Sequence, residues 1–283
     1  MKDIYQTIAE KRPSMSKSHL KVANYILDNR STVPFFTVGK LAELTGVSDA
    51  TVFRFATTLG FSGYNELQQY LQDSMHTQLT AQERMKMSNE IYHTEDEKGV
   101  YEIFQDDIAN IQSSFEKLDL ASFKKSVQLM LDARKIYIVA NRSTRSLGLF
   151  MHHYLHLIME DAELIRTADE AAEKFLKASE KDLVIGLSFS RYSKKTIDIF
   201  SFAKEKGIKT IAITDNSFSP LLPGTEAALT VSTQMPSFID SYTAPLSLIN
   251  ALINYIGRAK EEKLTGRLDQ LEKTWEKFDT FYK

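Results

Sequence analysis

The 283-residue chain contains no cysteine. This absence excludes disulfides, thiol nucleophiles and cysteine-ligated zinc, and it is compatible with a reducing cytoplasm. An excess of one charge is also missing, because 35 Lys and Arg residues stand against 37 Asp and Glu residues. A nucleic-acid partner would therefore have to be bound by a local patch and not by a basic field over the whole protein.

Long apolar runs are absent as well. The chain begins MKDIYQTIAEKRPSM, which contains acidic residues and no apolar signal segment, and no later stretch is long and apolar enough to span a bilayer. We therefore expect a cytoplasmic protein without membrane contact. The composition, 43% hydrophobic and 25% charged, is typical of globular proteins, and 283 residues are more than one ordinary domain uses. Two domains are predicted.

The first part of the chain has the pattern of an all-α domain. Apolar residues recur at helical spacing over residues 1–76, with breaks at Pro34, Gly46 and Gly60. Residues 77–99 are polar and lack sustained periodicity, and we interpret them as a linker with some helix in it. From residue 100 apolar residues return at helical spacing, and these predict helices that lead into a second domain over residues 100–283.

The second part of the chain has a different hydrophobic pattern from the first. Short runs rich in β-branched residues occur at 135–140, 162–166, 182–189, 209–214 and 227–232. Amphipathic helical stretches separate most of these runs, and such alternation predicts a three-layer α/β domain with a five-stranded parallel sheet. Ligands of such sheets bind at the carboxyl ends of the strands, so the residues just after each run are candidates for a site.

Two predicted helices in the first domain are joined by a very short turn, in GKLAELTGVSDATVFRFATTLG (39–60). We expect a first helix over 40–45, a left-handed turn at Gly46, and Ser48 as the cap of the second helix. The residues expected to point inward are Leu41, Ala42, Leu44, Val52, Phe53 or Phe55, and Ala56. Those expected on the outer face of the second helix are Asp49, Ala50, Thr51, Arg54 and Thr58.

This outer face, small and polar with one arginine, suits a helix that reads DNA. Short side chains allow the helix to enter the major groove, and an arginine can donate two hydrogen bonds to guanine. Spacing alone leaves a second interpretation open, namely an ordinary helical hairpin, because helix–glycine–helix patterns are common.

Residues 39–71 resemble the helix-turn-helix segment of the RpiR family of bacterial transcription regulators. The residues that match the family pattern are Ser48, Ala50, Thr51, Val52, Arg54, Phe55, Leu59, Gly60, Phe61, Gly63, Tyr64 and Leu67. The resemblance implies that Ser48, Thr51 and Arg54 contact DNA, with Asp49 beside them. It also implies that Lys40 and Tyr64 hold phosphates.

Members of this family carry a C-terminal sugar isomerase (SIS) domain that binds a phosphosugar, and the resemblance covers nearly the whole chain. After the first strand the family pattern is G-x-G-x-S, where this chain has Ala140, Arg142 and Thr144. After the third strand the pattern S-x-S-G-x-T is answered by SFSRYS, with the residues Ser188, Ser190, Arg191 and Ser193. The hydroxyls are thus kept, while arginine replaces glycine in each loop.

The resemblance implies an anion site in these loops, because hydroxyls and amides at a helix N-terminus favour an anion. Taken alone, SFSRYSKKT is also compatible with a strand-to-helix turn that ends in a capping serine. Arg142 and Arg191 either bind a phosphate or carboxylate, or close the pocket or bond across a subunit interface. Asp240 and Ser241 are expected to line the site, with helix capping as the alternative.

Catalysis is not expected. A sugar isomerase needs a general base, usually Glu or His, near the sugar carbons, and the candidate stretch STQMPSFIDSY (232–242) has no glutamate. His152 and His156 stand one turn apart, but His153 occupies the position where a zincin has glutamate, and no third ligand is evident. We predict neither metal nor cofactor, and buried or interface histidines explain this run.

The sequence therefore predicts a regulator of sugar or amino-sugar metabolism genes that binds operator DNA and responds to a phosphosugar. The alternatives are a sugar-phosphate isomerase with a helical appendage and a ligand-independent dimeric scaffold. Residues 101–118 and 244–260 are more apolar than one small sheet needs for its cover, which predicts a homodimer or a dimer of dimers. Two-fold symmetry would then require a palindromic operator.

Overall fold

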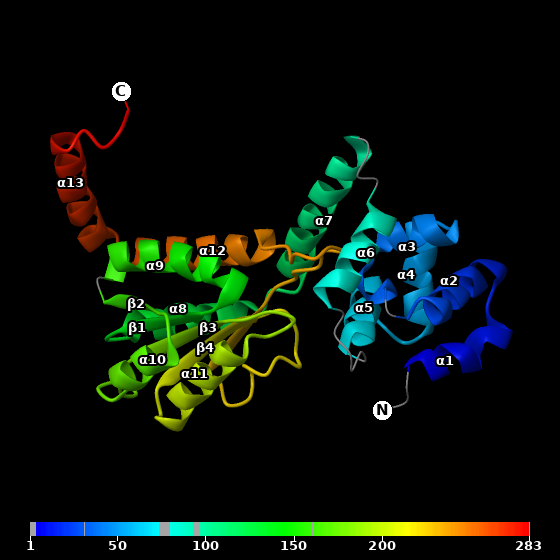
Figure 1. The fold of residues 1–283 in the computed structure, drawn as a ribbon, viewed down its shortest axis with the longest axis horizontal. Helices are drawn as coiled ribbons and strands as arrows, with labels where there is room; N and C mark the ends of the chain where they lie inside the picture. The colour runs from blue at the N-terminus through cyan, green and yellow to red at the C-terminus, as the bar shows by residue number, and fades with distance from the viewer. Residues whose placement is uncertain (1–3, 31, 74–79, 93–96, 160, 283) are drawn as a thin grey trace. The chain divides into compact units, whose positions relative to one another are not determined.

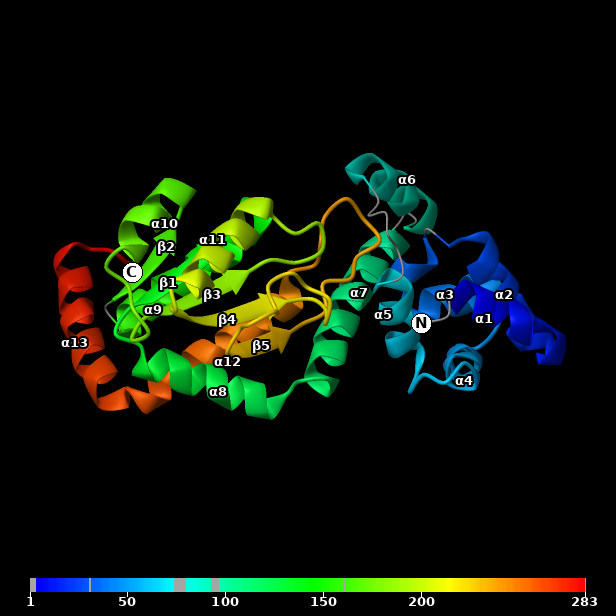
Figure 2. The ribbon, with the colours of Figure 1, turned by 90° about the horizontal axis from the view of Figure 1, so that it is seen from below.

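The computed structural model describes residues 4–30, 32–73, 80–92, 97–159 and 161–282 (Figures 1 and 2). The chain forms two compact units, one of residues 1–115 and 232–241, the other of residues 116–231 and 242–283. The main chain therefore passes between the units three times. Among the described residues, no helix combines the length and the apolarity that crossing a membrane requires.

The first unit is helical. Its α-helices are α1 (Ile4–Lys11), α2 (Lys17–Asp28), α3 (Val38–Thr45), α4 (Asp49–Thr58), α5 (Tyr64–Asp73), α6 (Ala81–Ile91) and α7 (Glu97–Glu116), the last residue of which belongs to the second unit. Hydroxyl caps begin several of them, as where the Ser16 and Thr37 side chains accept from the backbone N–H groups of His19 and Lys40. The fully buried core includes Ile8, Ile26, Leu41, Phe55 and Leu67.

Helix α6 lies inside the stretch 77–99 that the sequence indicates as a linker. A capping box begins it, in which the Thr80 side chain and the Glu83 side chain each bond the other residue's backbone N–H. Its packed face includes polar side chains, since Arg84 and Ser88 are each 7% exposed. Helix α6 and most of α7 belong to the first unit, so the helical unit extends well beyond residue 76.

The second unit is a three-layer α/β domain, as predicted. Its strands are β1 (Ile136–Ala140), β2 (Ala162–Ile165), β3 (Leu183–Leu187), β4 (Lys209–Thr214) and β5 (Ala227–Thr230). All pairs are parallel, in the order β2-β1-β3-β4-β5. The helices are α8 (Leu120–Asp132), α9 (Arg145–Met159), α10 (Ala168–Phe175), α11 (Lys194–Glu205), α12 (Thr243–Ala259) and α13 (Glu261–Lys277).

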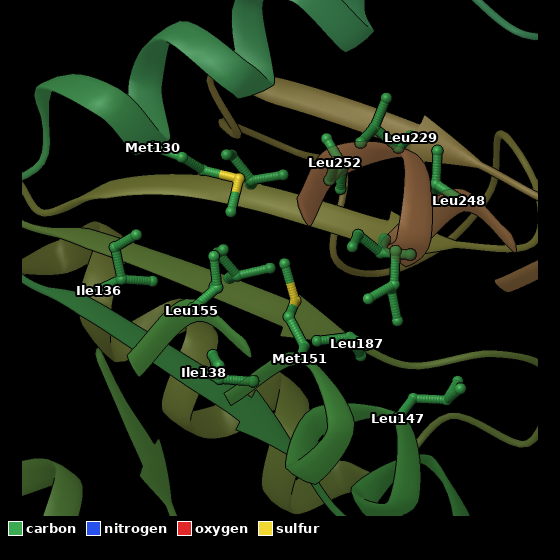
Figure 3. Packing of buried hydrophobic residues seen from close by; sticks show 14 of the residues in the cluster. Met130, Ile136, Ile138, Leu147, Met151, Leu155, Leu187, Leu229, Leu248 and Leu252 are labelled. Carbon is green, nitrogen blue, oxygen red and sulfur yellow. The ribbon is translucent and has the colours of Figure 1, made fainter. Parts of the chain in front are cut away.

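Alternate residues of the strands serve two cores. Ile136 and Ile138 of β1 pack with Met151 and Leu155 of α9 and with Leu252 of α12, in the cluster that Figure 3 shows. The intervening residues of the strands pack on the other face with Phe175 of α10 and Phe200 of α11. Figure 1 shows α9 and α12 on one face of the sheet and α10 and α11 on the other. This arrangement brings the loops after β1, β3 and β4 to one edge of the sheet.

Candidate functional site

The turn between α3 and α4 has the geometry that the sequence indicates. Gly46 has φ 61°, the left-handed conformation that glycine adopts without strain. The N–H of Gly46 bonds the Glu43 carbonyl at 3.2 Å, and the N–H of Val47 bonds the Ala42 carbonyl at 3.0 Å. These bonds end α3 and fix the angle at which α4 begins, as in helix-turn-helix readers of DNA.

The exposed face of α4 differs from the expected one at one position. Asp49, Ala50, Arg54 and Thr58 are exposed as expected, but Thr51 is only 9% exposed. Thr51 lies one turn before the fully buried Phe55, so the same side of the helix buries both. Phe53 is the aromatic residue that faces outward, with 50% exposure.

Leu44 of α3 is a second correction, since it is 39% exposed and not inward. Leu41 and Thr45, one turn apart, take the buried side of this short helix. Ser48 occupies the cap position of α4, but its hydroxyl lies 3.0 Å from that of Thr51 and makes no capping bond to the backbone. The Ser48 side chain is exposed beside the first turn of α4.

Lys40 and Tyr64, the two expected phosphate contacts, differ in what they can reach. The Lys40 ammonium lies 3.2 Å from the Glu43 carboxylate, and the Lys40 side chain is only 12% exposed. Tyr64 is 2% exposed, and its hydroxyl donates to the Phe36 carbonyl at 2.9 Å. Burial raises the pKa of Tyr64, which keeps its proton on that bond. In this structure Tyr64 therefore holds the loop before α3 inside the unit.

Lys21 is a basic residue that the sequence pattern does not indicate as a DNA contact. Its ammonium lies beside Gly46, at the turn between α3 and α4, and its side chain is exposed. Lys21 comes from α2, so only the folded arrangement brings it to the turn. A positive charge at this position adds to the local basic character around α4.

At the edge of the sheet, Arg142 and Arg191 have left-handed backbones. Their φ angles are 58° and 61°, and Asp279 is the one other described residue besides glycine with positive φ. An L-residue in this conformation costs roughly 1–2 kcal/mol. Because the family pattern has glycine at both positions, the backbone of this chain keeps a glycine geometry while it carries two exposed guanidinium groups.

The four hydroxyls expected in the site differ in whether they already donate a hydrogen bond within the protein. Ser188 accepts from the N–H of Ser193 at 3.2 Å, and Ser193 accepts from the N–H of Thr196 at 3.5 Å as the cap of α11. Within the described residues neither hydroxyl donates to a protein acceptor, so both protons are available. Thr144 donates to the Asn141 carbonyl at 2.8 Å, so its hydroxyl proton is already engaged within the protein.

Ser190 bonds to Asp215, a residue that the pattern reading did not select. Its N–H and its hydroxyl donate to one oxygen of the Asp215 carboxylate, at 2.9 and 2.6 Å. The Tyr192 hydroxyl donates to the other oxygen at 2.7 Å. Burial, and then the Asp215 charge, raises the pKa of Tyr192. Asp215 comes directly after β4, which is the signal that would have revealed it.

Comparison with known proteins agrees with both halves of this geometry. Residues 2–78 match the model of the helix-turn-helix domain of the rpiR family, and residues 129–255 match the model of the SIS domain. Together these models cover most of the chain. The chain belongs to the RpiR family.

Curated relatives of this RpiR-family chain are named as transcriptional regulators. The HTH-type transcriptional regulator HexR of Pseudomonas aeruginosa is 26% identical, over 88% of this chain and 85% of its own. An HTH-type transcriptional regulator of Caldanaerobacter subterraneus is 27% identical, over 95% of each chain. The chain is thus a DNA-binding regulator, and the prediction of a regulator in preference to an isomerase is confirmed.

Solved structures show the same fold. The NanR protein of Vibrio vulnificus, solved in complex with ManNAc-6P, is 20% identical over 98% of this chain and 99% of its own, with a TM-score of 0.60. The sugar isomerase domain of an RpiR transcription factor from Sphaerobacter thermophilus is 21% identical over 61% of this chain and 97% of its own, with a TM-score of 0.59.

Asp240 and Ser241 of this RpiR-family chain lie in the helical unit. The Arg84 guanidinium bonds the Asp240 carboxylate at 2.8 Å and the carbonyls of Ser237 and Ile239 at 2.6 Å each. Ser241 donates to Asp107 of α7 at 2.5 Å. In this structure both residues hold the segment 232–241 against α6 and α7, and neither caps a helix.

Of the three histidines of α9, His152 is partly buried, whereas His153 and His156 are exposed. The His152 ring stacks on that of His156 at 5.8 Å between centroids, and its Nε2 lies 3.1 Å from the Ala162 carbonyl. Burial lowers the pKa of His152, which favours the neutral ring. Over the residues that the structure describes, no group of three or more His, Cys, Asp or Glu could hold a metal.

Proposed function

We propose that this RpiR-family regulator, acting in the cytoplasm, binds a phosphorylated sugar or amino sugar at the edge of its sheet and thereby controls genes of sugar metabolism. The observation that carries the proposal is the pair of arginines in left-handed loops beside two serines with protons to donate. NanR, which has the same fold, was solved with a phosphorylated amino sugar.

Within this site we assign direct contact with the phosphate to Arg142, Arg191, Ser188 and Ser193. Guanidinium groups bind phosphate through charged hydrogen bonds, and the hydroxyls lie at the N-terminus of α11, where the helix dipole favours an anion. Ser190 and Thr144 receive a positioning role, because Asp215 and the Asn141 carbonyl already accept their protons. Asp240 and Ser241 are assigned to the segment that they hold in the helical unit.

On DNA, we propose that Arg54 reads a base while Ser48, Asp49 and Lys40 lie along the groove. All four belong to the helix-turn-helix, and Ser48, Asp49 and Arg54 are exposed on or next to the first two turns of α4. Thr51 supports Ser48 through its hydroxyl, and Tyr64 supports the loop before α3. The regulator is proposed to act as a homodimer or a dimer of dimers on a palindromic operator.

A thermal-shift screen tests the effector. A ligand that binds only the folded state raises its stability by mass action, by about 2.7 kcal/mol at a hundred times its dissociation constant. Hexose phosphates and amino-sugar phosphates are expected to raise the melting temperature, and the unphosphorylated sugars at equal concentration are not. If sugars and their phosphates act alike, or if none of the compounds acts, the proposed phosphosugar site is wrong.

A further inference from the structure

Helix α7 has the reverse of the usual amphipathic pattern. Its buried side chains are polar, with Asp106 at 8% and Asn110 at 2% exposure. Asp106 accepts from the Tyr92 hydroxyl at 2.5 Å, and Asn110 accepts from the Ser232 hydroxyl at 2.6 Å and donates to the Gln234 carbonyl at 2.5 Å. These bonds fix which face of α7 turns toward its own unit.

The opposite face of α7 is apolar. We call its five residues the α7 stripe: Tyr101, Phe104, Ile108, Ile111 and Phe115. Their exposed fractions are 68, 65, 55, 41 and 74% in that order. The spacing alternates between three and four residues, which is the a and d pattern of helices that pack along another helix. An exposed apolar row of this length marks an interaction surface.

We infer that the α7 stripe packs against the α7 stripe of a second copy of the chain. The inference rests on the proposed two-fold assembly and adds the surface that holds it. The flanking e and g positions are Gln105, Asp107, Gln112 and Ser114. With one acid and no cation, these positions do not suit a nucleic acid, and two copies meet with little repulsion between like charges.

The area of the stripe agrees with a symmetric pair. An aromatic side chain buries ~150–250 Å² when fully covered, and three of the five side chains are aromatic, so the partly exposed stripe offers on the order of 500 Å² per copy. Two copies together bury about 1,000 Å², close to the ~1,200 Å² at which specific interfaces begin. The stripe therefore supplies most of an interface, and neighbouring residues at its edges, such as Val100 with 56% exposure, supply the rest.

A cysteine scan tests this pairing directly, because the chain has no cysteine of its own. Ile108 is the middle residue of the stripe, so full overlap of two stripes about a two-fold axis places the two Ile108 side chains together. The Ile108→Cys variant is expected to form a disulfide-linked dimer under mild oxidation, since a disulfide needs Cα atoms about 4.4–6.8 Å apart. Ala109→Cys is the matched control, exposed on the same helix but about 100° away around it.

A charge in the stripe gives the second measurement. Phe104→Glu is expected to lower the molar mass by light scattering at micromolar concentration, and Leu176→Glu, at a residue 76% exposed in the other unit, is expected to leave it unchanged. Wild-type protein that is already a monomer would overturn the two-fold assembly and this inference together. A wild-type dimer that survives Phe104→Glu, with Ile108→Cys linking no faster than Ala109→Cys, would overturn this inference alone.

Discussion

Arg191 combines a charge and a strained backbone, and three substitutions separate the two. Arg191→Gln keeps the side-chain carbon that makes φ 61° unfavourable but removes the charge. Arg191→Lys keeps both the strain and the charge but loses the planar fork. Arg191→Gly removes strain and charge together.

The expected effects follow from these differences. A hydrogen bond to a charged group contributes ~1.5–3 kcal/mol, and the exposure of Arg191 favours the lower figure, so Arg191→Gln should weaken phosphosugar binding about ten-fold. Its melting temperature should not rise. Arg191→Gly should lose the same affinity, yet relief of ~1–2 kcal/mol of strain exceeds the ~0.5–1 kcal/mol that glycine loses through its freer unfolded chain. The net gain of about 0.5–1 kcal/mol corresponds to a melting temperature roughly 1–4 °C higher.

The assay is calorimetric titration of each variant with the phosphosugar that the thermal-shift screen selects, together with scanning of the unliganded protein. Operator affinity without effector serves as the control, and it should stay unchanged because the substitution lies in the other unit. Arg191→Gln protein that binds the effector within two-fold of wild type would refute the anion-binding role. If that variant binds normally but dissociates into smaller oligomers, Arg191 is an interface residue.

Three further predictions concern the helical unit. Arg54→Ala should cost about 1–3 kcal/mol on operator DNA and much less on random DNA, as measured by fluorescence anisotropy, and equal losses on both would make Arg54 a phosphate contact. The pKa of Asp106 is raised to about 6, chiefly by burial. Between about pH 4 and 6 the Asp106 carboxyl therefore keeps a proton in the folded state that it has lost in the unfolded state. The free energy of unfolding should therefore fall by about 3 kcal/mol as the pH rises from about 4 to 6. Asp106→Asn should remove that dependence and stabilise the protein at pH 7 in urea titrations, and a pH profile equal to that of wild type would contradict the assignment. Arg84→Met should lower the free energy of unfolding by about 2–4 kcal/mol, because it leaves the Asp240 carboxylate without its partner. Adding Asp240→Asn should recover part of that loss, and urea unfolding of the double variant with no recovery would show that the ion pair is not the cause.

The sheet and helix α4 could be predicted from the sequence because burial determines which residues occupy their positions. Strand β1 is buried at all five positions, and β-branched and aromatic residues fill such strands. Gly46 likewise marks its own turn, since few other residues adopt φ 61°. In each of these places the local pattern and the tertiary environment require the same residue type.

Helix α6 and the buried face of α7 could not be predicted in this way. Their packed positions carry the polar residues Arg84, Ser88, Asp106 and Asn110. Arg84 and Asn110 bond a segment more than 120 residues away, and Asp106 bonds Tyr92, which directly follows α6. Hydrophobic periodicity does not detect a polar interface of this kind. The bond between Ser190 and Asp215 joins residues 25 apart, and the position of Asp215 directly after β4 is the one local sign of it.

The segment 232–241 limits how the helical unit of such a regulator can be exchanged for that of another regulator. It lies between β5 and α12 in the chain, yet its hydrogen bonds go to Arg84, Asp107 and Asn110 of the helical unit. A chimera joined after residue 115 would give this segment a foreign set of partners and leave buried polar groups unpaired. A functional exchange of the DNA-binding unit must therefore transfer residues 232–241 together with the N-terminal part of the chain. Recombination at a single crossover is expected to yield unstable proteins.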